Sequence, residues 1–373
     1  MSFPPPPGGP SPGNSGPPQG YSGPYGPPPQ QPPWPQQWQP GPPPKKRGNA
    51  WKWALGAVAL LAVIGVTAAV TISVTSDGGD ERDPTPSGET YGLASADDTG
   101  PVNIITEDPT CAAWTPINER LAKAQRNGWE SIDRSIRASD WSPEQRAQYV
   151  AVGQAMLDAA DQTERLVRMT PHRTMRQLFE QFIGYARAYS EAIPTYSPPA
   201  NYLATVAADA SSSIGNICAT LAYGSAQTWS PSVPSVAPPS HLTPLQDPKH
   251  ARPFLSSPDR TCPEWEPLLR RFKADTASWS TVDASKPATQ WTPEERSSAE
   301  ALIPVVENFA EDAERLGRQS TNGVLQDFAV LAAQYRRAFA QALPSYSPAD
   351  SYLSAVAVDL TNLIFDACKA VED

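Results

Sequence analysis

Asp108-Pro109-Thr110-Cys111 opens one copy of a module that this chain contains twice, and Asp259-Arg260-Thr261-Cys262 opens the other. Cys218 closes the first copy and Cys368 closes the second, so the cysteines of a copy are 107 and 106 residues apart. The repeat therefore favours the disulfides Cys111–Cys218 and Cys262–Cys368 among the possible connectivities. A zinc site is the alternative, but such a site usually needs closely spaced cysteines or nearby histidines, and no such cluster occurs in the sequence.

The two copies match along their length at a nearly constant offset. Trp141-Ser142-Pro143-Glu144 matches Trp291-Thr292-Pro293-Glu294, and Pro194-Thr195-Tyr196-Ser197-Pro198 matches Pro344-Ser345-Tyr346-Ser347-Pro348. A solenoid needs about three or more units, so two copies indicate a domain duplication.

The sequence pattern of each copy predicts four helices. The second helix begins after Ser142 or Thr292, which can cap it, and has proline at its first helical position. Apolar residues then recur at steps of three and four, as on the buried side of a packed helix. Four sequential helices with short connections favour an up-down-up-down bundle. In that topology the first helix starts where the fourth one ends, which is where the cysteines of each copy lie.

A stretch without charge from Trp53 to Val74 is long enough to cross a bilayer as a helix. Lys45, Lys46 and Arg47 precede it and acidic residues follow it, so the positive-inside rule puts the N-terminus in the cytoplasm and the repeats outside, at the plasma membrane. A cleaved signal peptide is the competing interpretation, but it has a shorter apolar core and a shorter preceding region.

The predicted fold class is all-α: two tandem disulfide-pinned four-helix bundles after one transmembrane helix and a disordered N-terminal tail. The proline-rich tail cannot bury enough apolar surface to order itself. The predicted segments are the tail at 1–50, the transmembrane helix at 51–75, a linker at 76–107, the first bundle at 108–224, a Pro/Ser-rich linker at 225–258 and the second bundle at 259–373.

Composition argues against several functions. The net charge of −10 argues against nucleic acid as a partner. The chain has 3 histidines, none of them matched between the copies, which weakens general acid–base and metal chemistry. Glycine-rich phosphate loops and HExxH motifs are absent from the sequence. We therefore expect no enzymatic activity, no cofactor and no metal.

The clearest duplicated polar feature lies on the second helix of each copy. Acidic residues there precede arginines by four positions, which is the favourable order for helix pairing. The two interpretations are a docking patch shared by both copies and a solvated face whose charges pair with one another. The residues concerned are Asp161, Glu164, Arg165, Arg168, Glu311, Glu314, Arg315 and Arg318.

Matched aromatic residues offer further candidates. Trp114, Trp129 and Trp141 recur as Trp265, Trp279 and Trp291, and they could line a groove for lipid or glycan or pack in the core. The Pro-Thr/Ser-Tyr-Ser-Pro element joins the third and fourth helices, as a rigid turn or as a platform for a small aromatic ligand.

The first part of the chain resembles single-pass envelope proteins of actinobacteria with proline-rich cytoplasmic tails. The resemblance rests on Met1-Ser2-Phe3-Pro4 with its polyproline run, on Lys45-Lys46-Arg47 and on Trp51-Lys52-Trp53. It implies a role in the cell envelope, as in sensors or envelope-assembly factors, and it carries over no site residue.

We therefore expect a non-enzymatic, membrane-anchored envelope protein whose duplicated module binds or scaffolds another envelope protein, a lipid or a glycan. The alternative is a transmembrane sensor whose proline-rich tail recruits a polyproline-binding partner in the cytoplasm.

Overall fold

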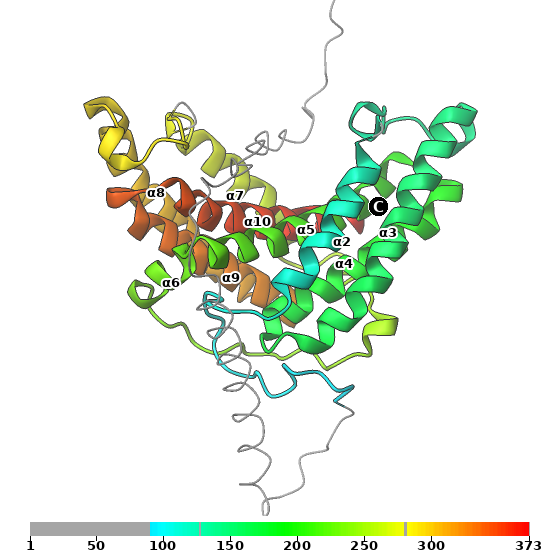
Figure 1. Cartoon of the computed structure of the whole chain (residues 1–373), viewed down its shortest axis with the longest axis horizontal. Coiled ribbons are helices and arrows are strands. Elements are labelled where there is room, and N and C mark those ends of the chain that lie inside the picture. The colour runs from blue at the N-terminus through cyan, green and yellow to red at the C-terminus, as the bar shows by residue number, and fades with distance from the viewer. Residues whose placement is uncertain (1–89, 127, 280–281, 373) are drawn as a thin grey trace, which may run out of the picture. The chain divides into compact units, whose positions relative to one another are not determined.

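The computed structural model describes residues 90–126, 128–279 and 282–372 (Figure 1). In these residues the structure is all-helical, with nine α-helices and no strand. The helices are α2 (Cys111–Gln125), α3 (Pro143–Met169), α4 (Arg173–Ala192), α5 (Asn201–Ala222), α6 (Ser225–Trp229), α7 (Cys262–Asp275), α8 (Pro293–Gly317), α9 (Gly323–Ala342) and α10 (Ser351–Ala370). Four long helices per copy are thus present, as predicted.

The same local signal starts the longest helix of each copy. Ser142 accepts a hydrogen bond from the backbone N–H of Gln145, whose side chain accepts one from the Ser142 N–H in return. Thr292 and Glu295 form the same capping box at the start of α8. Both boxes satisfy backbone donors that the first turn of a helix leaves free.

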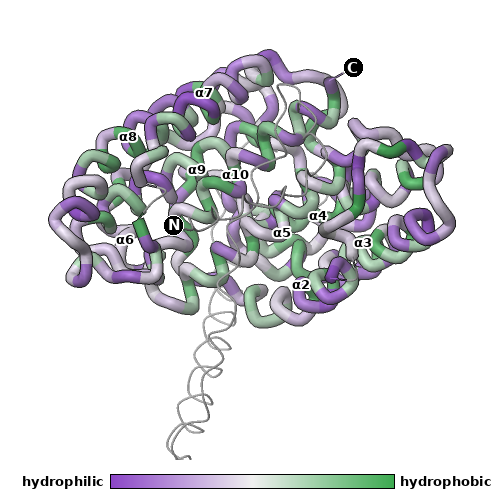
Figure 2. The backbone as a smooth tube through the Cα atoms, turned by 90° about the horizontal axis from the view of Figure 1, so that it is seen from above, coloured by the Kyte–Doolittle hydropathy of each residue, from purple (hydrophilic) through white to green (hydrophobic). Residues whose placement is uncertain are grey.

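The centre of the fold is the contact between α5 of the first copy and α10 of the second, which lie side by side (Figure 1). Helix α4 packs on α5, α9 packs on α10, and α3 and α8 pack outside them. Figure 2 shows that the outer helices α3, α7 and α8 are the more hydrophilic ones. The buried apolar side chains of both copies form one continuous core.

The predicted fold class is corrected in two respects. The copies are not two separate bundles: the described residues of both copies belong to one compact unit, because α5 and α10 bury side chains against each other as well as inside their own copies. None of the described helices combines the length and the apolarity that a membrane crossing requires. The stretch predicted to cross the membrane, 53–74, and the tail at 1–50 lie outside the described residues.

Both predicted disulfides are present. Cys111–Cys218 ties the start of α2 to α5, and Cys262–Cys368 ties the start of α7 to α10. The Asp-x-Thr-Cys motif before each helix has a structural role: Asp108 accepts hydrogen bonds from Thr110 and from the Thr170 hydroxyl, which lies between α3 and α4. Asp259 does the same with Thr261 and Ser320 in the second copy.

Two extended segments cover the side of the fold formed by α4 and α9. One precedes α2 and buries Leu93, Val102, Ile104 and Ile105; the other joins the copies (Figure 1). In the joining segment, the Phe254 ring contacts Tyr185 of α4 and Phe328 of α9, with centroids 6.0 and 5.9 Å away. Segments that connect the predicted bundles therefore contribute to the common core.

Candidate functional site at the junction of the copies

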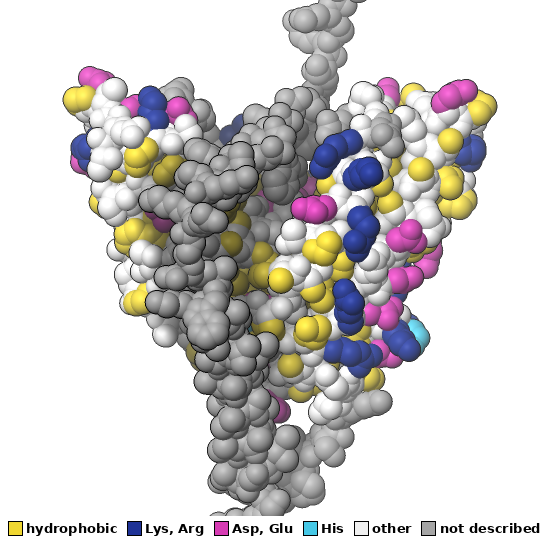
Figure 3. All heavy atoms as spheres, in the orientation of Figure 1, with side chains coloured by type: hydrophobic (Ala, Val, Ile, Leu, Met, Phe, Trp, Pro, Cys, Tyr) yellow, Lys and Arg dark blue, Asp and Glu magenta, His cyan; other side chains and the backbone are white. Residues whose placement is uncertain are grey.

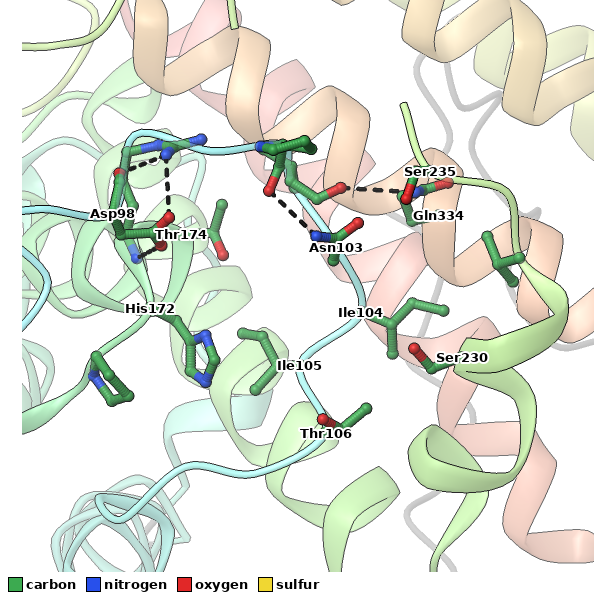
Figure 4. A pocket seen from close by; sticks show the side chains of 15 residues that line it. Asp98, Asn103, Ile104, Ile105, Thr106, His172, Thr174, Ser230, Ser235 and Gln334 are labelled. Atoms are coloured by element: carbon green, nitrogen blue, oxygen red, sulfur yellow. Dashed lines mark hydrogen bonds and ion pairs between the residues drawn. The ribbon is translucent and has the colours of Figure 1, made fainter. Parts of the chain in front are cut away.

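A cavity of about 600 Å³ lies where the segment before α2 crosses both copies (Figure 4). Residues 101–106 form one wall, the turn before α4 and its first residues form another, and the start of the joining segment with Gln334 of α9 completes it. The cavity therefore depends on parts of both copies and on both covering segments.

Arg173, the first residue of α4, holds this junction together. The residue is 3% exposed, and its Nε and Nη2 donate to the Oδ2 and Oδ1 atoms of Asp327 on α9, over 2.9 and 3.2 Å. Gln177 donates to the same Asp327 carboxylate over 2.9 Å. A two-pronged arginine–carboxylate contact fixes direction as well as distance, so this pair sets the orientation of α4 against α9.

The same arginine holds the covering segment. Its guanidinium donates to the backbone carbonyls of Asp98 and Gly100, over 2.5 and 3.1 Å. In return, Asp98 Oδ2 accepts the backbone N–H of Arg173 over 2.7 Å. The carboxylate thus caps the start of α4, where the helix dipole favours negative charge. Residues 98–100 are therefore anchored at one end of the cavity.

Most polar side chains on the cavity walls are neutral. They are hydroxyls and amides, which can both donate and accept hydrogen bonds. Gln334 donates to the carbonyl of Pro234 over 3.2 Å, and this bond links α9 to the joining segment. Neutral polar groups between apolar ones suit a ligand with alternating amide and apolar parts. The neutral hydroxyl and amide residues of the walls are Asn103, Thr106, Thr174, Ser230, Ser235 and Gln334, the apolar ones are Pro101, Val102, Ile104, Ile105, Pro171 and Val233, and the remaining ones are Asp98, His172 and Arg173.

The backbone that crosses the cavity is extended. In the part of the chain that the structure describes, residues 101–107 form no backbone–backbone hydrogen bond. Side chains engage several of their carbonyls: Pro101 accepts from Asn103, Val102 from Gln334, Thr106 from Gln227, and Glu107 from His172 when its ring Nε2 carries the proton. Another extended chain can add along such a segment through the backbone groups that the fold does not use.

The structure separates the members of the predicted docking patch in the first copy. Asp161 and Glu164 accept from Arg187 of α4 over 2.8 and 2.6 Å, rather than from the arginines four residues on. Arg168 donates to the Tyr91 carbonyl and to Asp247, so it anchors both covering segments. Arg165 is exposed. Figure 3 shows basic and acidic side chains close together over α2 and α3.

The second copy repeats this arrangement in part. Glu314 pairs with Arg318 over 2.8 Å and with Arg337 of α9 over 2.7 Å, where Arg337 matches Arg187. Arg318 also donates to the Ala237 carbonyl, and Arg315 pairs with Asp312. Glu311 lines a smaller cavity between α7 and α8. Docking at this patch stays a prediction, with Asp161, Arg165, Glu311 and Arg315 as its exposed members.

The matched aromatic residues lie mainly inside the fold. Trp114 packs edge-on against Phe179 and Phe182, and its counterpart Trp265 is fully buried. Tyr196 of the proline-rich turn donates to the Arg134 carbonyl over 2.9 Å, and Tyr346 donates to Ala284 in the same way. These contacts give the tryptophans and the turns a packing role.

The cavity could not be predicted from the sequence, because its walls come largely from segments with the pattern of linkers. The sequence contains one signal that this segment is buried: Val102-Asn103-Ile104-Ile105 is mostly apolar, and a linker that lies in solvent needs no such residues. Within the described residues, no group of three or more His, Cys, Asp or Glu is arranged to hold a metal ion.

The fold and the cavity define a class of duplicated, disulfide-linked, all-helical proteins with a polar site at the junction of the copies. The family described as mycobacterial ESX-1 associated protein matches residues 93–372, so this chain belongs to that family. A relative from Mycolicibacterium smegmatis (strain MKD8), described as an uncharacterized protein, is 45% identical over 348 residues, which are 91% of this chain and 90% of the relative. No solved structure matches the chain.

Proposed function

We propose that this protein is a non-enzymatic binding module of the ESX-1 secretion system in the cell envelope, and that it holds an extended segment of a partner protein in the cavity at the junction of the copies. The family supports the association with ESX-1. The extended backbone of residues 101–107, which runs along a cavity of about 600 Å³, is the observation that carries the choice of ligand.

The walls of the cavity fit a polypeptide better than a lipid. A lipid chain offers no hydrogen-bonding groups to the hydroxyl and amide side chains of the walls, such as Thr106, Thr174 and Ser235, and polar groups that lose water without gaining a partner weaken a complex. A peptide offers amides to these groups and apolar side chains to Ile104 and Val233. The backbone of residues 101–107 would contribute main-chain hydrogen bonds, and the wall side chains would select the sequence.

The disulfides support a location outside the cytoplasm. Cys111–Cys218 and Cys262–Cys368 account for all the cysteines of the chain. Disulfides persist in oxidising compartments and are rare in the cytosol of ordinary bacteria. An extracytoplasmic position in the envelope would let the module meet proteins that the secretion system exports or assembles there.

Site-specific photo-crosslinking in a mycobacterial host with active ESX-1 secretion tests the proposal. A photoreactive amino acid replaces Asn103, which lines the cavity, and in a control chain it replaces Glu144, which is exposed on α3. The proposal expects an adduct with an ESX-1 component or exported protein from position 103 and none from position 144. Equal labelling from both positions would argue against a site in the cavity.

A variant that fills the cavity links binding to export. Thr106→Trp places a large side chain in the wall, and Ser139→Trp adds the same side chain at an exposed position as a control. We expect export of ESX-1 proteins to fall in the first variant and to stay at the wild-type level in the second. Normal export with a folded, equally abundant Thr106→Trp protein would contradict the proposed role.

A further inference from the structure

The contact between α5 and α10 contains three polar pairs at seven-residue spacing along both antiparallel helices. Tyr223 stacks on Tyr352, with centroids 5.4 Å apart and ring planes within 4°. Asn216 donates from Nδ2 to Asp359 Oδ2 over 2.7 Å. The third pair, Asp209 and Asp366, lies one such step further along the two helices, and each carboxyl group affects the pKa of the other.

The duplication makes two of these pairs equivalent. Asp209 of the first copy matches Asp359 of the second, and Asn216 matches Asp366. The approximate twofold relation between the copies therefore places Asp359 opposite Asn216 and Asp209 opposite Asp366. One pair is aspartate with asparagine, and the other is aspartate with aspartate.

These two pairs differ in whether their hydrogen bond requires a protonated carboxyl group. An amide N–H donates to a carboxylate at any pH, so the Asn216–Asp359 contact needs no proton. Two carboxylates have no donor between them, so the Asp209–Asp366 contact exists only if one of them is protonated. Without that proton, Asp209 Oδ2 is buried and has no hydrogen-bond partner among the described residues.

The neighbouring helices give Asp209 little positive charge. Asp209 is 7% exposed, and the charged groups acting on it are Asp366 and Asp359, both on α10. On α9, Arg336 acts on Asp359, whereas the matching position on α4 is Ala186. On α2, Asn118 is uncharged and accepts a hydrogen bond from Ser211 of α5. Lys369 of α10 is engaged with Glu266 of α7 and with Glu372.

Burial and these like charges act in the same direction. Burial raises the pKa of Asp209 well above its ordinary value, and the negative charges of Asp366 and Asp359 raise it further. Burial also raises the pKa of Asp366, to about 6, while Thr205 and Asp209 hydrogen-bond to it and oppose the shift. The Asp359 pKa rises to about 7 through burial, with Asn216 and Arg336 opposing the shift.

We propose that Asp209 and Asp366 share a proton across the contact between α5 and α10, and that loss of this proton as the pH rises loosens the packing of the two copies. This inference rests on the helix contact and is independent of the ligand in the cavity.

The direction of the pH effect follows from linkage. A carboxyl group with a raised pKa in the folded state stabilises the fold fully below its unfolded pKa of about 4, and this contribution is lost as the pH rises through the folded pKa. The folded state should therefore lose stability between about pH 4 and neutral pH, because the raised pKa values of Asp366 and Asp359 are about 6 and about 7.

Thermal unfolding of the full-length protein between pH 5 and pH 8 tests the proposal. The wild-type midpoint should fall as the pH rises. Asp366→Asn converts the pair into a copy of Asn216–Asp359, so its midpoint near neutral pH should be higher by about 3–6 °C and should depend less on pH. Asn216→Asp creates a second carboxyl pair and should make the dependence steeper.

Two further variants complete the test. Asp209→Asn replaces the other half of the pair and should act like Asp366→Asn, so the test stands if one variant does not fold. Asp158→Asn removes the same charge from an exposed position of α3 and should leave the wild-type profile unchanged. A wild-type midpoint that stays level or rises over this range would overturn the proposal. So would wild-type pH dependence in both Asp366→Asn and Asp209→Asn.

Discussion

Single residues at the junction are sensitive to replacement, because their charges are buried. The Arg173 guanidinium and the Asp327 carboxylate are both buried, and each is the main counter-charge of the other. Taking one charge away from such a pair leaves the second in a low-dielectric environment without compensation.

Replacement of one member of this pair should be strongly destabilising. We expect Arg173→Met to lower the free energy of unfolding by about 3–5 kcal/mol, measured by urea denaturation. The double variant Arg173→Met/Asp327→Leu should recover much of this loss, because it leaves no buried charge unpaired. If the double variant were as unstable as the sum of the two single ones, the pair would not be coupled.

Gly184 tests the packing of the joining segment on α4. A Cβ atom at this position would lie 2.7 Å from the Arg252 carbonyl carbon and 2.9 Å from the Pro253 nitrogen, both of them backbone atoms. Gly184→Ala should therefore displace the joining segment and lower the free energy of unfolding by about 1–3 kcal/mol. Gly100→Ala is the control, since nothing lies within 4 Å of its Cβ; a similar loss in both would refute the close approach.

At the scale of elements, the sequence was most informative where a local signal decides the outcome. The capping residues Ser142 and Thr292 start α3 and α8, and the apolar residues predicted to line these two helices are buried. The cysteine spacing predicted both disulfides because closing positions recur in each copy.

The capping boxes offer a matched pair of variants. Ser142→Ala and Thr292→Ala should each lower the free energy of unfolding by about 1 kcal/mol, because each leaves the N–H of residue 145 or 295 without its side-chain acceptor. Chemical denaturation measures both. An unchanged free energy of unfolding in both variants would mean that water replaces the capping side chain without loss of stability.

The contact between α5 and α10 could not be predicted from hydrophobic periodicity. On α5, the polar residues Asp209, Ser211, Ser212 and Ser213 are all buried. Within the sequence of one copy, small and polar residues at an interface cannot be distinguished from those of a solvent-exposed helix face. The pairing shows only when both copies are compared, since Asp209 and Asn216 match Asp359 and Asp366.

The candidate site could not be predicted from the sequence for a similar reason. Its walls belong to covering segments without helical periodicity, which proline and serine content marks as linkers. Buried Ile104 and Ile105 and the Phe254 ring between α4 and α9 show that these segments are part of the core. Long-range contacts of this kind leave no regular pattern in one sequence.

At the scale of the molecule, the described residues form one compact unit and not two linked bundles. The copies meet at α5 and α10, at the Arg173–Asp327 pair and under both covering segments. The cavity exists only while these contacts hold, so the proposed binding function depends on the copies staying together. Loosening of the α5–α10 contact at higher pH would weaken the same junction.

Differential scanning calorimetry of the full-length protein with its disulfides intact tests this unity most directly. One transition with equal calorimetric and van't Hoff enthalpies is expected if the copies unfold together. Arg173→Met should shift that transition to lower temperature without splitting it. Two separate transitions in the wild-type protein, of which Arg173→Met shifts one alone, would contradict the account.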